Sequence, residues 1–111
     1  MALSVWPLSV VLDAEGCTEK VTLVNCGQTD LVIKIKTSNI TDYTFKPVHT
    51  IIKSGATKYV EIVRKKAPPK RDRFVLVYAP LPPKATDAQS AFNAAASTII
   101  GQITVQLHAI P

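Results

Sequence analysis

Residues 31–37 read Leu-Val-Ile-Lys-Ile-Lys-Thr, and this stretch has the cleanest alternation in the sequence. Every second side chain is large and apolar, which is the period-two alternation of a strand with one face in a core. The predicted core face carries Leu31, Ile33 and Ile35, and the opposite face carries Val32, Lys34 and Lys36. The stretch therefore predicts a strand whose outer face presents two cations.

The same alternation recurs on both sides of residues 31–37, with turn-forming residues between the runs. It predicts seven short strands. The first is broken at Pro7, because proline cannot donate to a strand ladder. The predicted strands span residues 4–5 with 9–12, 19–25, 31–37, 43–46, 57–64, 73–79 and 101–108.

One short helix is expected before the last strand. Alanine is dense over residues 87–96, and Thr86 or Asp87 can cap the first turn. Phe92 is expected to anchor this helix onto the strands. A chain of 111 residues, 47% of them hydrophobic, suits a single domain over residues 1–111. The pattern as a whole predicts an all-β, seven-stranded immunoglobulin-like sandwich.

The predicted topology brings distant residues together. In the seven-strand immunoglobulin arrangement, the third, sixth and seventh strands share a sheet. Lys34 and Lys36 would then lie beside the sixth strand, whose outer face carries Arg73 and Val75. The exposed glutamines of the last strand would complete this face. We expect a basic surface with an apolar spot, suited to a protein partner or an acidic peptide.

The charge of the chain is concentrated in one loop. The chain has 13 Lys and Arg against 8 Asp and Glu, and residues 64–73 hold six of the cations and one acid, so this segment accounts for the net charge of +5. Ahead of the sixth strand its cations are Arg64, Lys65, Lys66, Lys70 and Arg71. Such a loop is either merely solvated or accepts an acidic partner. Nucleic acid is not expected, because no interleaved aromatic residue or nucleic-acid-binding motif accompanies the cations.

The N-terminal residues and the two cysteines bear on whether the protein is cytosolic or secreted. No Lys or Arg precedes the apolar residues 2–12, so they predict a first strand in preference to a secretory signal. No apolar run approaches the roughly 20 residues that span a bilayer. Cys17 and Cys26 would flank one extended strand, roughly 30 Å apart, which favours free thiols and the cytosol. A secreted domain, cleaved at its N-terminus and glycosylated at Asn39, is an alternative.

No catalytic residues, metal ligands or cofactor are expected. His49 and His108 lack the spacing of metal ligands. The chain shows no nucleophile elbow, glycine-rich phosphate loop or carboxylate pair. These observations favour a protein that binds or assembles and is not an enzyme.

Five segments resemble, in order and spacing, the major sperm protein domain of nematodes. That family's pattern reads roughly L-T-L-x-N, F-K-V-K-T-T, Y-x-V-x-P, a turn with Pro-Gly, and K-F-x-V. Lys34-Ile35-Lys36-Thr37 is the most specific match. The corresponding segments here are residues 21–25, 33–38, 43–47, 52–55 and 72–77. The resemblance implies an immunoglobulin-like, PapD-like sandwich in the cytosol of sperm.

The resemblance also implies two functions. Major sperm proteins dimerise and polymerise into the filaments that drive sperm crawling, whereas membrane-anchored relatives capture acidic peptides that contain phenylalanine. Carried over by motif, the peptide-binding positions are Lys36, Thr37, Ser38, Arg73 and Val75. The leading hypothesis is a sperm module that binds a protein partner through this face. The alternative is a cytoskeletal subunit that self-associates, beginning with a homodimer.

Overall fold

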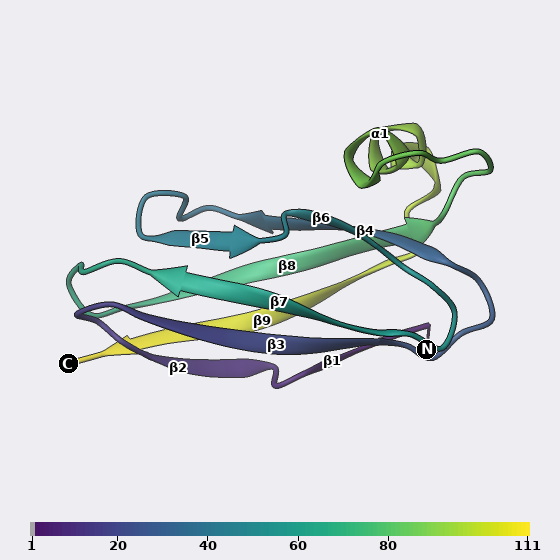
Figure 1. Ribbon diagram of the computed structural model, residues 1–111. Coiled ribbons are helices and arrows are strands. Elements are labelled where there is room, and N and C mark those ends of the chain that lie inside the picture. The colour runs from purple at the N-terminus through teal and green to yellow at the C-terminus, as the bar shows by residue number, and fades with distance from the viewer. Residues whose placement is uncertain (1) are drawn as a thin grey trace.

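The computed structural model describes residues 2–111 (Figure 1). These residues form nine strands, one α-helix and one 3-10 turn. The elements are β1 (Leu3–Trp6), β2 (Ser9–Asp13), β3 (Cys17–Asn25), β4 (Leu31–Thr37), β5 (Tyr43–Lys46), β6 (His49–Ile52), β7 (Thr57–Arg64), β8 (Lys70–Pro80), α1 (Ala88–Ala94), η1 (Ala96–Thr98) and β9 (Gly101–Ile110).

The strands form two sheets that face each other. One sheet has the order β1-β3-β7-β5, and the other has the order β2-β9-β8-β4-β6. Within the described residues β2 and β9 are parallel, and the other pairs run antiparallel. The main core lies between the sheets and includes Ile33, Ile62, Phe74 and Leu76, all with no measurable exposure. The predicted all-β sandwich is therefore confirmed.

The predicted number of strands is wrong, since nine are found in residues 2–111 instead of seven. The two halves of the predicted first strand belong to different sheets, because β1 pairs with β3 whereas β2 pairs with β9. The additional strand is β6, whose four residues carry two adjacent isoleucines and so show little alternation. Its strand conformation is set by pairing with residues 31–34 of β4, which is a tertiary contact.

Helix α1 lies on the outside of the five-stranded sheet (Figure 1). Asp87 caps its first turn as expected: the side chain accepts a hydrogen bond from the Ser90 N–H at 2.9 Å, which lowers the pKa of Asp87. Phe92 anchors the helix and is buried. A second apolar cluster thus forms beneath the helix, and it contains Val32, Val77, Ala79, Ala91, Phe92 and Ala95.

A buried asparagine ties the two sheets together at one end. The Asn25 side chain at the end of β3 donates to the carbonyl of Ile52 in β6 at 3.0 Å and to that of Thr29 at 2.8 Å. Its Oδ1 accepts from the Gly27 N–H at 3.0 Å. Three backbone groups therefore depend on one fully buried side chain.

We expect Asn25→Ala to lower the free energy of unfolding by about 2–3 kcal/mol, because it leaves the buried carbonyl of Ile52 and two part-buried backbone groups without partners. Urea unfolding followed by circular dichroism measures this change. Gln28→Ala, in the same turn but exposed, should stay within about 0.5 kcal/mol of the wild type. Equal stability of the two variants would contradict a structural role for Asn25.

Candidate functional site

Strands β4, β8 and β9 lie side by side, as predicted. Their register places Lys36 opposite Val75, and Arg73 opposite Gln106. Side chains of directly paired residues point to the same face of a sheet. The two cations and Val75 therefore share the outer face of the five-stranded sheet.

Five of the six predicted partner-binding residues surround one hollow on this face. The hollow has a volume of about 350 Å³ and is lined by Lys36, Thr37, Ser38, Arg73 and Val75. We call these five residues the outer-face site. A second hollow of about 260 Å³ shares Ser38 and Arg73 with it and extends the surface to Arg71, Asp72 and Gln106.

Hydrogen bonds fix the edge of this site. The Thr37 hydroxyl donates to the carbonyl of Arg73 at 3.0 Å, which links the end of β4 to β8. Asn39, in the loop that follows, donates to Asp42 at 3.0 Å and to Asp72 at 2.9 Å. The loop behind Ser38 is thereby held against β8.

The same hydrogen bonds hold the carboxylate of Asp72, which is the acid next to Arg73 in the sequence. The Asp72 side chain is only 7% exposed and is held by Asn39 and Lys70, and Asp72 does not line the outer-face site. Within residues 2–111, Lys36 and Arg73 have no carboxylate at ion-pair distance.

Asn39 is nearly buried, and its side-chain amide donates both of its hydrogen bonds within the chain, to Asp42 and Asp72. The folded chain therefore does not present Asn39 for glycosylation.

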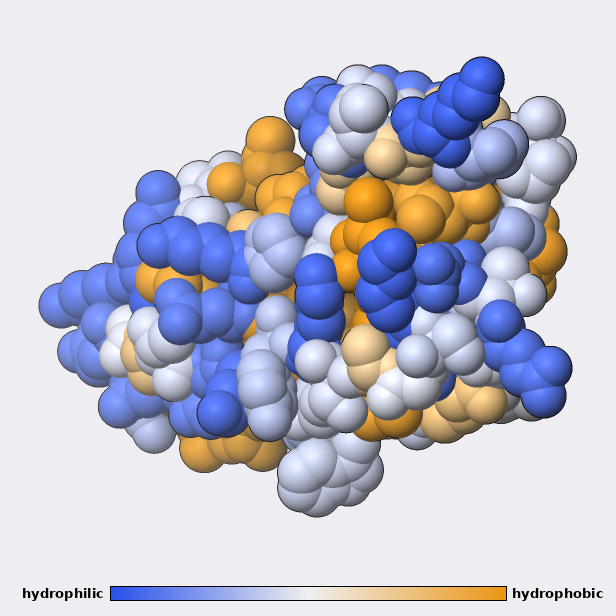
Figure 2. Space-filling model, turned by 45° about the vertical axis from the view of Figure 1, so that its right-hand side comes forward, coloured by the Kyte–Doolittle hydropathy of each residue, from blue (hydrophilic) through white to orange (hydrophobic). Residues whose placement is uncertain are grey.

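Lys34, the sixth predicted residue, lies outside this hollow. Its side chain is half-buried, with Nζ 5.9 Å from the centre of the Phe92 ring. It borders a neighbouring hollow of about 590 Å³, which shares Lys36 and Thr37 with the outer-face site and whose lining also includes Ile40 and Val48. On the face drawn in Figure 2, hydrophilic side chains stand directly beside apolar surface. Lys34 therefore contacts the helix through Phe92 as well as adding a positive charge to the outer face of the sheet.

The predicted basic loop is less exposed than its sequence suggests. Arg64 is only 2% exposed, because it follows Val60 and Ile62 on the inward face of β7. Strand β8 begins at Lys70, so Lys70 and Arg71 belong to a strand. Lys66 pairs with Glu15 at 3.7 Å. The expectation that Arg64 belongs to an exposed cationic loop is therefore wrong.

His49 is a residue whose position the sequence did not indicate. It lies in β6 opposite Lys34, and its ring centre is 6.0 Å from that of Phe92. Burial lowers the pKa of His49 below its ordinary value of 6.5, the charge of Lys34 lowers it further, and Asp87 acts in the opposite direction. Packing beneath the helix therefore favours the neutral imidazole.

We predict that the chain loses stability as the pH falls below about 6.5, because unfolded His49 takes up a proton more readily than folded His49. Its contribution is complete above the unfolded pKa and is lost as the pH falls through the lowered folded pKa. Urea unfolding at about pH 7.5 and about pH 5 should show a smaller loss for His49→Gln than for the wild type. An identical loss in both proteins would contradict this role, and His108→Gln serves as the matched control.

No group of three or more His, Cys, Asp or Glu side chains could hold a metal ion within residues 2–111. In the same range, no helix is both long and apolar enough to cross a membrane. Cys17 and Cys26 are free thiols, in agreement with the prediction.

Comparison with known proteins identifies relatives over nearly the whole chain. Residues 2–101 match the model of the MSP (major sperm protein) domain. Sperm-specific class P protein 16 of Caenorhabditis elegans is 38% identical over 109 residues, which cover 98% of each chain. Sperm-specific class P protein 19 of the same organism is 37% identical over 109 residues, with the same coverage.

Comparison with solved structures points to the same domain family and the same fold. The structure of SSP-19, an MSP-domain protein of C. elegans, superposes with a TM-score of 0.92 at 34% identity, covering 97% of this chain and 99% of that one. The PapD-like domain of human CEP192 superposes with a TM-score of 0.68 at 10% identity, covering 98% of this chain and 85% of that one, and this likeness concerns the fold alone. The family match and the curated relatives together establish that the chain belongs to the major sperm protein domain family.

Proposed function

We propose that the chain is a non-enzymatic binding module of the nematode sperm cytosol, which captures an acidic, phenylalanine-containing segment of a protein partner on the outer-face site. The observation that carries the proposal is the single hollow shared by Lys36, Thr37, Ser38, Arg73 and Val75. The names of the sperm-specific relatives support the cellular setting.

The chemistry of the hollow suits such a ligand. Lys36 and Arg73 project from neighbouring strands, and neither has a carboxylate partner within the described residues. Two carboxylates of an extended peptide could therefore form charge-assisted hydrogen bonds with them. Val75 is half-buried between these cations and offers apolar contact to an aromatic ring. Selectivity would come from this combination, and affinity would fall with added salt.

Fluorescence anisotropy with a labelled acidic peptide carrying one phenylalanine tests the proposal. We expect the double variant Lys36→Glu with Arg73→Glu to weaken binding at least tenfold, because it replaces attraction with repulsion at both contacts. Lys58→Glu with Lys84→Glu is the matched control. It changes the net charge equally at two exposed positions outside the outer-face site, and should retain most of the affinity.

Equal loss in both double variants would show that only net charge matters, and would refute the outer-face site. Undiminished binding by the Lys36 and Arg73 variant would refute it as well.

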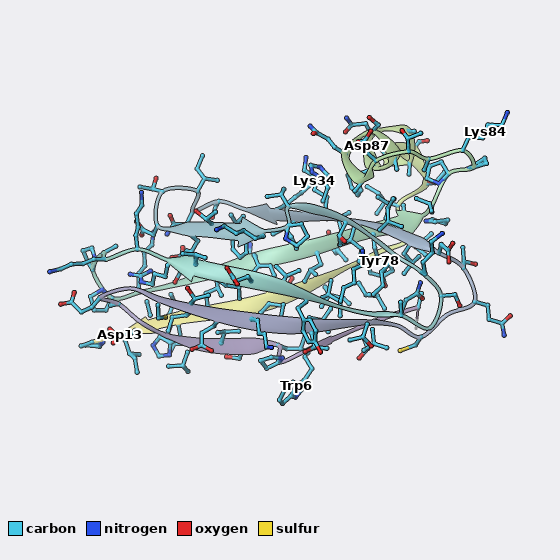
Figure 3. All side chains as sticks on the ribbon, viewed as in Figure 1. Trp6, Asp13, Lys34, Tyr78, Lys84 and Asp87 are labelled. Carbon is cyan, nitrogen blue, oxygen red and sulfur yellow. The ribbon has the colours of Figure 1, made fainter. Side chains whose placement is uncertain are left out.

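A second candidate function is self-assembly. Apolar side chains are exposed where β1 leads into β2: Trp6 is 72% exposed, Leu8 53% and Val11 56%. Figure 3 shows Trp6 pointing away from the sandwich. Exposed aromatic residues are enriched in protein interfaces. This edge therefore favours a contact between copies, as expected of a cytoskeletal subunit.

Sedimentation velocity over increasing protein concentration tests this candidate. Self-assembly predicts a rising sedimentation coefficient that Trp6→Ala reduces, because the exposed indole would anchor the contact. The exposed Ile40→Ala variant, at 81% exposure, is the control and should behave as the wild type. A wild-type chain that stays monomeric throughout would contradict self-assembly.

A further inference from the structure

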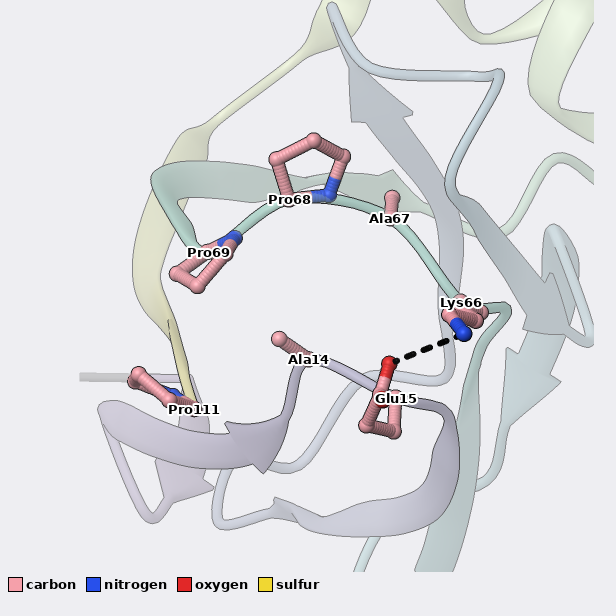
Figure 4. A pocket seen from close by; sticks show the side chains of 7 residues that line it. All are labelled: Ala14, Glu15, Lys66, Ala67, Pro68, Pro69 and Pro111. Atoms are coloured by element: carbon pink, nitrogen blue, oxygen red, sulfur yellow. Dashed lines mark ion pairs between the residues drawn. The ribbon is translucent and has the colours of Figure 1, made fainter.

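A further cavity lies between the loop that joins β7 to β8, the turn after β2 and the end of β9, away from the outer-face site (Figure 4). It has a volume of about 700 Å³ and shares no lining residue with the outer-face site. We call it the end pocket. Its lining comprises Ala14, Glu15, Lys66, Ala67, Pro68, Pro69 and Pro111.

Arg64 holds one wall of the end pocket in place. Its buried guanidinium donates two hydrogen bonds, to the carbonyls of Ala67 and Pro68, both at 3.0 Å. The other arm of the guanidinium donates to the Tyr43 hydroxyl at 2.9 Å. Burial raises the pKa of Tyr43, so this hydroxyl stays protonated while it accepts the bond. The loop between β7 and β8 is therefore anchored to the interior.

The opposite wall is joined to the same loop. The Ala67 N–H donates to the Ala14 carbonyl at 3.1 Å, and the Ala14 N–H donates to the Ile110 carbonyl at 2.8 Å. Gly16 permits this close approach: its φ is +118°, and a side chain there would come within 3.3 Å of the Arg64 carbonyl oxygen. The end pocket thus exists before any ligand arrives, which lowers the entropic cost of binding.

The lining specifies the chemistry of the occupant. Proline rings and alanine methyl groups make the walls apolar and free of large side chains, so a flat aromatic ring can lie against them. Lys65 and Lys66 are exposed in the same loop, Lys70 is exposed at the start of β8, and these cations favour carboxylates near the opening. The ion pair between Lys66 and Glu15 joins side chains that are 77% and 67% exposed, so a ligand can displace it at little cost.

We propose that the end pocket is a second docking site, which receives one aromatic side chain from an acidic segment of a protein partner. This site acts independently of the outer-face site. The chain could therefore hold two segments at once, and their linkage would raise the affinity beyond that of either alone.

Backbone amide NMR on the full ¹⁵N-labelled chain tests the proposal, with a peptide of one tryptophan between pairs of glutamates as the probe. We expect saturable shifts at the amides of Ala14, Glu15 and Ala67. These shifts should persist in the outer-face double variant Lys36→Glu with Arg73→Glu. They should disappear in Ala67→Trp, which fills the cavity, and should need at least tenfold more peptide in Lys65→Glu with Lys66→Glu.

Saturable shifts confined to the outer-face site would overturn the proposal without affecting the proposed function. End-pocket shifts that persist in both pocket variants would also overturn it. The peptide probe tests for a protein partner, and vesicles of anionic phospholipid test for a lipid surface as the alternative partner. If the chain binds the vesicles through Lys65 and Lys66 but does not bind the peptide, the assignment of a protein partner is overturned.

Discussion

The pairing of β4 with β8 is the constraint on which both the core and the outer-face site depend. Seven consecutive residues of β4 pair with seven of β8. In this register Ile35 and Leu76 enter the core, while Lys36 and Val75 face outward. A slip of one residue would drive lysines into the core and isoleucines into water, which costs far more than any single contact on the surface. The energetics of the core therefore fix the spacing of the cations outside it.

The cations of this chain serve different purposes according to the face on which they lie. Lys36 and Arg73 face solvent and are available to a ligand. Arg64 faces inward, where its hydrogen bonds organise a loop, and its Nε has no hydrogen-bond partner among the described residues. Burying an incompletely paired guanidinium is costly. Its hydrogen bonds to the carbonyls of Ala67 and Pro68 offset part of this cost and shape the loop that forms a wall of the end pocket.

Much of this arrangement could be predicted from the sequence, because period-two alternation assigns each side chain to a face without knowledge of its partners. That reasoning placed Lys36, Arg73 and Val75 on one surface, and the immunoglobulin topology brought their strands together. It failed where tertiary contacts determine whether a segment forms a strand or where a helix packs. Strand β6 depends on pairing with β4, and the helix that covers Val32 and Val77 can be placed on that face only in three dimensions.

The end pocket could not be predicted, because its walls come from loops whose side chains show no periodicity. The burial of Arg64 is a different case. Alternation along β7 already put it on the same face as Val60 and Ile62, but its position among five other cations suggested a solvated loop. Charge composition was the weaker guide, since an arginine can remain buried when it binds backbone carbonyls.

A crystal structure of the chain bound to an acidic, phenylalanine-containing peptide would show directly whether the outer-face site holds the ligand. We expect peptide carboxylates within hydrogen-bond distance of Lys36 and Arg73, with the phenylalanine ring against Val75. A peptide bound on the four-stranded sheet, with the outer-face site left open to solvent, would contradict this expectation.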